Sequence, residues 1–127
     1  MMRVYVPATW PMLQRMVKNG RLDPIGATAF ALTPKLRESY VTGDDEELEY
    51  AAMNEAARAS LRLLSVEFGL GEEGVPARRV VVAADLDGVA LRPDLDDAAV
   101  RLPGPVPVSA IAAVHVDVEE AEHGEVP

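Results

Sequence analysis

The chain has 127 residues, and its 21 acidic residues outnumber its 12 lysines and arginines to give a net charge of −9. This charge repels phosphate backbones and anionic membranes, so we expect neither nucleic acid nor a membrane as a partner. Without cysteine, and with 49% hydrophobic residues, the chain is neither a disulfide scaffold nor a disordered polymer but one soluble domain. Its first residues contain no apolar run of the length of a signal peptide or membrane span, which predicts a cytoplasmic protein.

The N-terminal segment predicts a short strand followed by an amphipathic helix. The strand covers residues 3–6 and ends at Pro7, and Thr9 can cap a helix whose first turn tolerates Pro11. Gly20 marks the end of this helix, because glycine readily adopts the left-handed conformation that is common there. Four side chains of the helix are expected to face inward, those of Trp10, Leu13, Met16 and Val17.

Large and small side chains alternate over residues 28–32. A period of two predicts a strand with Phe30 and Leu32 on one face and the intervening alanines on the other. Thr33 followed by proline is typical of a helix N-terminus, so residues 34–40 are expected to form one or two helical turns.

Residues 44–68 predict a long, alanine-rich helix, with Asp44 and Glu47 spaced as a reciprocal capping pair at its start. At about 100° per residue, its apolar and small side chains fill an arc of roughly 220°, whereas an ordinary surface helix needs about 100°. We therefore expect this helix to contact the sheet and a second surface. The arc consists of Leu48, Tyr50, Ala52, Met53, Ala56, Ala57, Ala59, Ser60, Leu61, Leu63, Leu64 and Phe68.

The second half of the sequence predicts several short strands. Residues 79–84 predict a strand in which Arg79 is followed by an uninterrupted apolar run, and such a run is typical of a central strand covered on both faces. Asp87-Gly88 predicts a turn, after which residues 89–91 are expected to return as an edge strand. Residues 99–102 predict a further strand.

The C-terminal segment begins with three prolines within residues 103–107. Proline keeps the chain extended and removes hydrogen-bond donors, so this stretch is expected at an edge or outside the sheet. Ser109 can cap a single helical turn before a strand over residues 113–118. In that strand the valines face one side, and His115 and Asp117 face the other.

The order of these elements predicts an α+β fold. We expect a two-layer sandwich in which two main helices cover one face of a mixed sheet of about five strands. A three-layer α/β arrangement is the alternative, which the continuous valine run favours and the short late strands disfavour. The domain is expected to span residues 1–118, and residues 119–127 to form an acidic, mobile tail.

Four side chains form a candidate metal site. Asp85 and Asp87 stand at the end of the predicted central strand, and His115 and Asp117 share one face of the last strand. Together they could offer carboxylate oxygens and an imidazole to a divalent cation, provided that the two strands are neighbours with aligned faces. The alternative interpretation is a turn at Asp87 and a surface histidine exposed to solvent.

Charged residues at helical spacing, Glu55, Arg58 and Arg62, are typical of a solvated face with modest ion pairing. The functional alternative is an arginine clamp for an anionic ligand, completed by Arg78 or Arg79. The sequence contains no glycine-rich phosphate loop before a helix and no Ser/His/Asp set in a recognisable context. It therefore predicts no catalytic residue and no cofactor.

Five stretches of the sequence together resemble an uncharacterised actinobacterial family of small proteins. The resemblance spans nearly the whole chain and implies a single cytoplasmic domain of unknown function, without assigned catalytic residues. The stretches that carry it are residues 2–9, 46–52, 57–64, 79–85 and 112–117.

These patterns favour a non-catalytic protein-interaction domain that binds a second copy of itself or another protein. One candidate surface is the wide apolar arc of the long helix. The other is a sheet face expected to carry Tyr5, Ala29, Ala31, His115 and Asp117. The alternative is a small-molecule-binding protein or a divalent-metal-dependent enzyme centred on the acidic strand ends.

Overall fold

The computed structural model describes residues 1–40, 43–69 and 80–116, without the side chains of residues 25 and 61–69. Within these described residues, three helices, two 3-10 turns (η) and eight strands follow one another. Their bounds are β1 Met2–Ala8, α1 Trp10–Asn19, β2 Arg21–Leu22, η1 Ile25–Ala27, β3 Thr28–Ala31, α2 Pro34–Ser39, α3 Asp45–Gly69, β4 Val80–Leu86, β5 Ala90–Leu91, β6 Ala99–Arg101, β7 Val106–Pro107, η2 Val108–Ala110 and β8 Ile111–Val116.

Six strands form one sheet in the order β5-β6-β3-β1-β4-β8, and β2 pairs with β7 in a small second sheet. Neighbouring strands run antiparallel in both sheets. The α+β class is therefore confirmed, with a six-stranded antiparallel sheet in place of the expected mixed sheet of about five strands. The two long central strands, β1 and β4, pair along their whole length.

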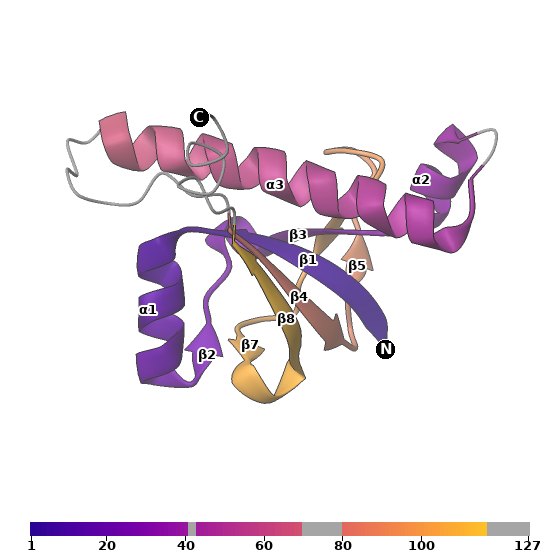
Figure 1. Ribbon diagram of the computed structural model, residues 1–127. Helices are drawn as coiled ribbons and strands as arrows, with labels where there is room; N and C mark the ends of the chain where they lie inside the picture. The colour runs from indigo at the N-terminus through magenta and orange to yellow at the C-terminus, as the bar shows by residue number, and fades with distance from the viewer. Residues whose placement is uncertain (41–42, 70–79, 117–127) are drawn as a thin grey trace, which may run out of the picture.

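The helices α1 and α3 lie on opposite faces of the large sheet (Figure 1). The prediction that both main helices cover one face is therefore wrong. In β1, Val4 and Val6 face α1 whereas Tyr5 faces α3, and the residues of β4 alternate in the same way. Because both central strands are apolar on both sides, each face of the sheet needs a cover, and each helix supplies one. The layering is that of the three-layer alternative, with antiparallel strands.

This alternation also divides the sheet face that was expected to carry small and mixed-polarity residues. Tyr5 packs in the core on the α3 side, whereas Ala29 and Ala31 pack in the core on the α1 side. The expectation that these three residues share one face is wrong, because Tyr5 stands opposite Phe30 in the register of β1 and β3. Cross-strand partners share a face, and Phe30 alternates with the alanines.

The face toward α1 is closed by α1 and the small sheet. The Thr9 hydroxyl accepts the Met12 N–H at 3.4 Å, and Gly20 ends the helix at a φ of 75°, as the sequence predicts. Val17 was expected inside but is 81% exposed, since it lies on the outer side of α1. The core on this side contains Val4, Val6, Met12, Leu13, Met16, Leu22, Val80, Val82, Val100, Leu102 and Val106.

The face toward α3 is closed mainly by alanines. The Asp44 carboxylate accepts the Glu47 N–H at 2.9 Å and caps the helix as predicted. Further along α3, the Ser60 hydroxyl donates to the carbonyl of Ala8 at 2.8 Å and accepts the N–H of Val80 at 2.9 Å. This buried serine thereby ties α3 to the end of β1 and the start of β4. The core here contains Tyr5, Phe30, Leu36, Ala52, Ala56, Ala59, Val81, Ala83, Ala98 and Ala99.

The second contact expected for α3 stays a prediction. Among the described side chains of the helix, Tyr50 is 61% exposed, and Met53 and Ala57 are half-buried on the outer flank. The predicted contact depends also on the side chains of Leu61, Leu63, Leu64 and Phe68, which lie outside the described residues. The sheet contact of the helix is present, through the alanine stripe.

One local prediction in the second half is confirmed and another needs correction. Strand β5 follows the predicted turn, in which Gly88 has a φ of 75°, and lies at the edge of the sheet as expected, paired with β6. The single turn η2 is present, but Pro107 stands at its N-cap position and no side chain caps it there, so Ser109 is not a cap. None of the described helices is long and apolar enough to cross a membrane.

Candidate functional site

The two aspartates at the end of β4 are engaged by positive charges rather than free for a metal. Arg3 is the cross-strand partner of Asp85, and its Nε and Nη2 donate to Oδ1 and Oδ2 at 2.7 and 3.1 Å. These hydrogen bonds lower the pKa of the Asp85 carboxyl. Asp87 is exposed, with Oδ1 lying 3.3 Å from the amino group of Met1.

His115 lies far from these aspartates on the same sheet. It stands opposite Val81, four residues before Asp85 in β4, which corresponds to about 13 Å at 3.3 Å per residue. Asp117 lies outside the described residues. The part of the chain that the structure describes contains no group of three or more His, Asp or Glu side chains that could hold a metal ion. The described candidates Asp85, Asp87 and His115 are therefore not brought together as one metal site, and the part of the site that depends on Asp117 stays a prediction.

Of the charged residues at helical spacing on α3, Glu55 and Arg58 form an exposed ion pair. The Arg58 side chain is mostly exposed, as expected for a solvated helix face. The other members of the hypothetical arginine clamp, Arg62, Arg78 and Arg79, lie outside the described side chains.

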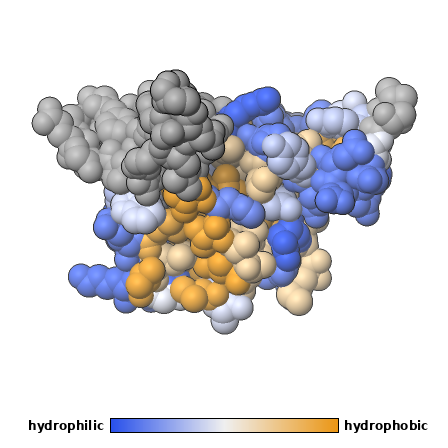
Figure 2. All heavy atoms as spheres, viewed as in Figure 1, coloured by the Kyte–Doolittle hydropathy of each residue, from blue (hydrophilic) through white to orange (hydrophobic). Residues whose placement is uncertain are grey.

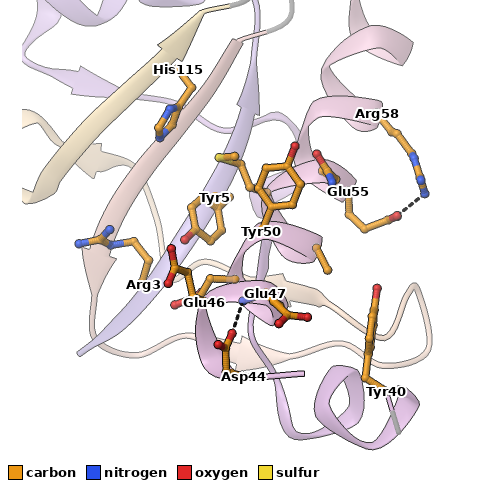
Figure 3. Close-up of a pocket in the computed structure, with 14 residues that line it drawn as sticks. Arg3, Tyr5, Tyr40, Asp44, Glu46, Glu47, Tyr50, Glu55, Arg58 and His115 are labelled. Carbon is orange, nitrogen blue, oxygen red and sulfur yellow. Dashed lines mark hydrogen bonds and ion pairs between the residues drawn. The ribbon is translucent and has the colours of Figure 1, made fainter. Parts of the chain in front are cut away.

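A groove with a volume of about 880 Å³ follows the N-terminal half of α3 (Figure 3). It exists because α3 packs mainly over β1 and β3, so the same face of β8 extends beyond the helix. The groove is lined by Arg3, Tyr5, Tyr40, Asp44, Glu46, Glu47, Glu49, Tyr50, Ala51, Met53, Asn54, Glu55, Arg58 and His115.

The lining falls on two sides of the helix. Figure 3 shows Arg3, Tyr5 and His115 on the side toward β8, and Tyr40 and Arg58 on the side toward α2. All three tyrosines of the chain line this groove. We call the first part, lined by β1, β8 and the adjoining flank of α3, the β8-side groove.

Glu49 is the unusual carboxylate of the β8-side groove. Its side chain is partly buried, and its Oε1 atom has no solvent contact and no hydrogen-bond partner among the described residues. Burial raises the pKa of Glu49, although a side-chain hydrogen bond with Tyr5 and the positive charge of Arg3 act in the opposite direction. Burial also raises the pKa of Tyr5, and the charge of Glu49 adds to that shift.

The sequence contains a signal for Glu49 in the helical period of α3. At about 100° per residue, Glu49 falls between Ala56 and Ser60, inside the buried arc of α3. A carboxylate at such a position is expected to be partly desolvated and to interact with whatever the strand below presents.

The second notable surface is the outer edge of β8. This strand ends the sheet order and has a neighbour, β4, on one side only among the described strands. Val114 and Val116 share one face of the strand, as the sequence predicts. This face is the α1 side, because they stand opposite Val82 and Val80. Figure 2 shows hydrophobic residues gathered over β8 and the adjoining turn η2. Val114 and Val108 are 40% and 45% exposed there.

The comparisons with known proteins give a family without an activity. A model described as a family of unknown function, DUF6912, matches residues 2–126. Neither a curated protein nor a solved structure matches the chain. The predicted membership of an uncharacterised family is thereby confirmed, whereas the actinobacterial origin stays a prediction.

Proposed function

We propose that this chain, which belongs to the DUF6912 family of unknown function, is a non-catalytic interaction domain that forms a homodimer through β8. The observation that carries this proposal is the uncharged, apolar outer edge of that strand. Two β8 strands that pair antiparallel across a two-fold axis would join two sheets into one, an isologous contact of the kind most homodimers use.

The two edges of the sheet differ in how they are protected. At one edge, β5 has two residues and is followed by Pro93 and by an ion pair of Arg92 with Asp94. Short strands, prolines and charges are the usual means of preventing edge-to-edge pairing. At the other edge, β8 has six residues, Ile111–Val116, with neither proline nor a formally charged side chain. Among the described residues, the β8 edge thus lacks the protection that the β5 edge has.

The charge of the protein restricts the surfaces through which a second copy can bind. Each copy carries a net charge of −9, so two copies repel each other except where the facing surfaces are uncharged. The edge of β8 provides such a surface. The apolar side of β8 could also pack against the same side of β8 in a second copy, because Ile111, Val114 and Val116 all lie on the α1 side of the strand.

The apolar surface extends beyond the strand. The N–H of Val108 in η2 donates to the carbonyl of Gly20 at 3.1 Å, which places this turn beside the end of α1. Val17, three residues before Gly20, is highly exposed there. A standard interface buries about 800 Å² of each partner, roughly a tenth of the 7468 Å² surface of this chain. The strand edge together with these flanking valines offers an apolar surface for such an interface.

Sedimentation equilibrium over 1 to 100 µM tests the proposal. We expect the wild-type chain to sediment with twice its chain mass at the upper end of this range. In the proposed dimer, Val114→Lys places the new positive charges of the two copies close together at the two-fold axis. This variant is therefore expected to be a monomer at every concentration. Leu91→Lys is the matched control, because Leu91 is an exposed residue of the opposite edge strand, and this variant should remain dimeric.

Circular dichroism establishes that both variants keep the fold. A wild-type chain that stays monomeric at 100 µM contradicts the proposal. So does a Val114→Lys chain that remains dimeric while folded, because its dimer then uses another surface.

A further inference from the structure

The symmetry of a β8 pair decides which faces of the two sheets meet. Two antiparallel strands that pair across a two-fold axis have that axis perpendicular to their sheet. Such an axis reverses the strand direction but keeps each face of the sheet on its own side. The α3 sides of the two copies therefore form one continuous face. His115 lies on that side, because it stands opposite Val81, which packs in the core beneath α3.

A β-bulge in β8 limits how two such strands can align. The register with β4 shifts at Ala112, which is the extra residue of the ladder. A bulge interrupts regular pairing, so residues 113–116 are the regular part of this edge within the described chain. A two-fold axis through this part passes beside Val114 or His115, its two inner residues.

Both alignments bring the His115 side chains of the two copies within reach of one metal ion. With the axis at His115, the two histidines stand directly opposite each other, with Cβ atoms about 4.5–5.5 Å apart. With the axis at Val114, His115 stands opposite Ala113 of the second copy, and the two histidines are diagonal neighbours about 7–8 Å apart. Zinc bonds an imidazole nitrogen at about 2.0–2.1 Å, so two rings and one ion span either separation.

The His115 imidazole is available for such a ligand. It is exposed, and it makes neither a hydrogen bond nor an ion pair with another residue that the structure describes. Figure 3 shows the ring projecting from β8 on the side of the sheet that carries Tyr5. Each copy has a net charge of −9, so a divalent cation at the axis would lower the repulsion between two copies.

We propose that the two His115 side chains of a β8 homodimer together bind one zinc ion, or another metal dication that prefers imidazole, and that this metal stabilises the dimer. The site rests on the homodimer proposed above, because each copy supplies one of the two imidazoles. Imidazole suits zinc, copper and nickel, whereas magnesium and calcium prefer oxygen ligands. Water completes the coordination of the metal in this arrangement.

Sedimentation equilibrium in EDTA and in zinc chloride, over the concentration range used for the dimer, tests the site. A ligand that binds the dimer but not the monomer shifts the equilibrium toward the dimer. We expect saturating zinc to lower the dissociation constant of the dimer at least about tenfold. Calorimetric titration should give one zinc ion for two chains, and magnesium chloride should have no effect.

Two histidine variants locate the site. His115→Gln should remain a dimer in EDTA but lose the effect of zinc, because the amide keeps a polar side chain and removes the imidazole. His123→Gln is the matched control, since His123 is the only other histidine in the sequence, and this variant should respond to zinc as the wild type does. Circular dichroism establishes that both variants keep the fold.

The outcomes separate the metal site from the dimer itself. A wild-type chain that is dimeric in EDTA and unaffected by zinc overturns the site and leaves the homodimer in place. A zinc effect that persists in His115→Gln also overturns the site, because other ligands then hold the metal. A chain that is monomeric in EDTA but dimerises with zinc through His115 supports the site and contradicts dimerisation without metal. A chain that is monomeric in both solutions contradicts both proposals.

Discussion

The two faces of the large sheet are packed by different means. Toward α1, the large sheet presents five buried valines and four buried alanines, and α1 and the small sheet add methionine, leucine and valine. Toward α3, the helix presents alanines at Ala52, Ala56 and Ala59 to two aromatic rings and to further alanines of the sheet. The first face is stabilised by the volume it buries, and the second by the close approach that small side chains permit. The faces also differ in charge, since Arg3 and Glu49 both interact with Tyr5 on the α3 side.

Removing volume from the α1 side should have the largest effect. Leu22 in β2 is 1% exposed and packs in the core beneath α1. Leu22→Ala is expected to lower the free energy of unfolding by about 2 to 5 kcal/mol, because the rigid surroundings leave a cavity. Urea denaturation measures this loss. Leu95→Ala, at an exposed leucine, is the matched control and should change stability by less than about 0.5 kcal/mol.

Adding volume to the α3 side is the complementary change. Ala56 is fully buried between α3 and the sheet, so Ala56→Leu forces the helix away from the strands. We expect a loss of about 1 to 3 kcal/mol in the free energy of unfolding, measured by the same denaturation. Ala57→Leu, one residue further on the half-exposed flank, should cost less. A stable Ala56→Leu variant would mean that the α3 side is loosely packed, and the contrast between the faces would fail.

Local patterns in the sequence predicted the individual elements well. Thr9 and Gly20 mark the ends of α1, Asp44 caps α3, and the continuous apolar run of β4 indicates that both faces are covered. Each of these features depends on residues close together in the chain. The strand order, in contrast, depends on residues far apart in the chain, because β1 pairs with β3 and with β4 from the other half of the sequence. Without that order, the side of the sheet on which each helix lies could not be predicted.

The same limit applies to the candidate site. Asp85 was identified as a candidate metal ligand, but its partner Arg3 lies 82 residues away and meets it only through the register of β1 and β4. His115 was placed on the correct side of its strand relative to the valines, yet its distance from Asp85 follows from the register of β8. Glu49 could have been found from the helical period alone, since it falls inside the buried arc of α3.

The smallest predicted effect concerns the charges on the α3 side and appears as a dependence of stability on pH. Burial raises the pKa of Glu49 in the folded chain above its unfolded value, so the folded state binds the proton more tightly. The stability contributed by this proton is present below the usual glutamate pKa, about 4.3, and is lost as the pH rises through the raised folded value. Glu49→Gln does not titrate there. Its melting temperature relative to wild type should therefore increase from pH 4 to pH 7.

Asp85 provides the control of opposite sign on the same face. The hydrogen bonds from Arg3 lower the pKa of Asp85, so its contribution to stability is present above the unfolded pKa and is lost as the pH falls through the folded value. Asp85→Asn should therefore melt below wild type at pH 7, and this difference should shrink in acid. If both variants instead shift in the same direction between pH 4 and pH 7, burial of Glu49 is not what sets the charge balance of this face, and the contrast with the α1 side reduces to packing alone.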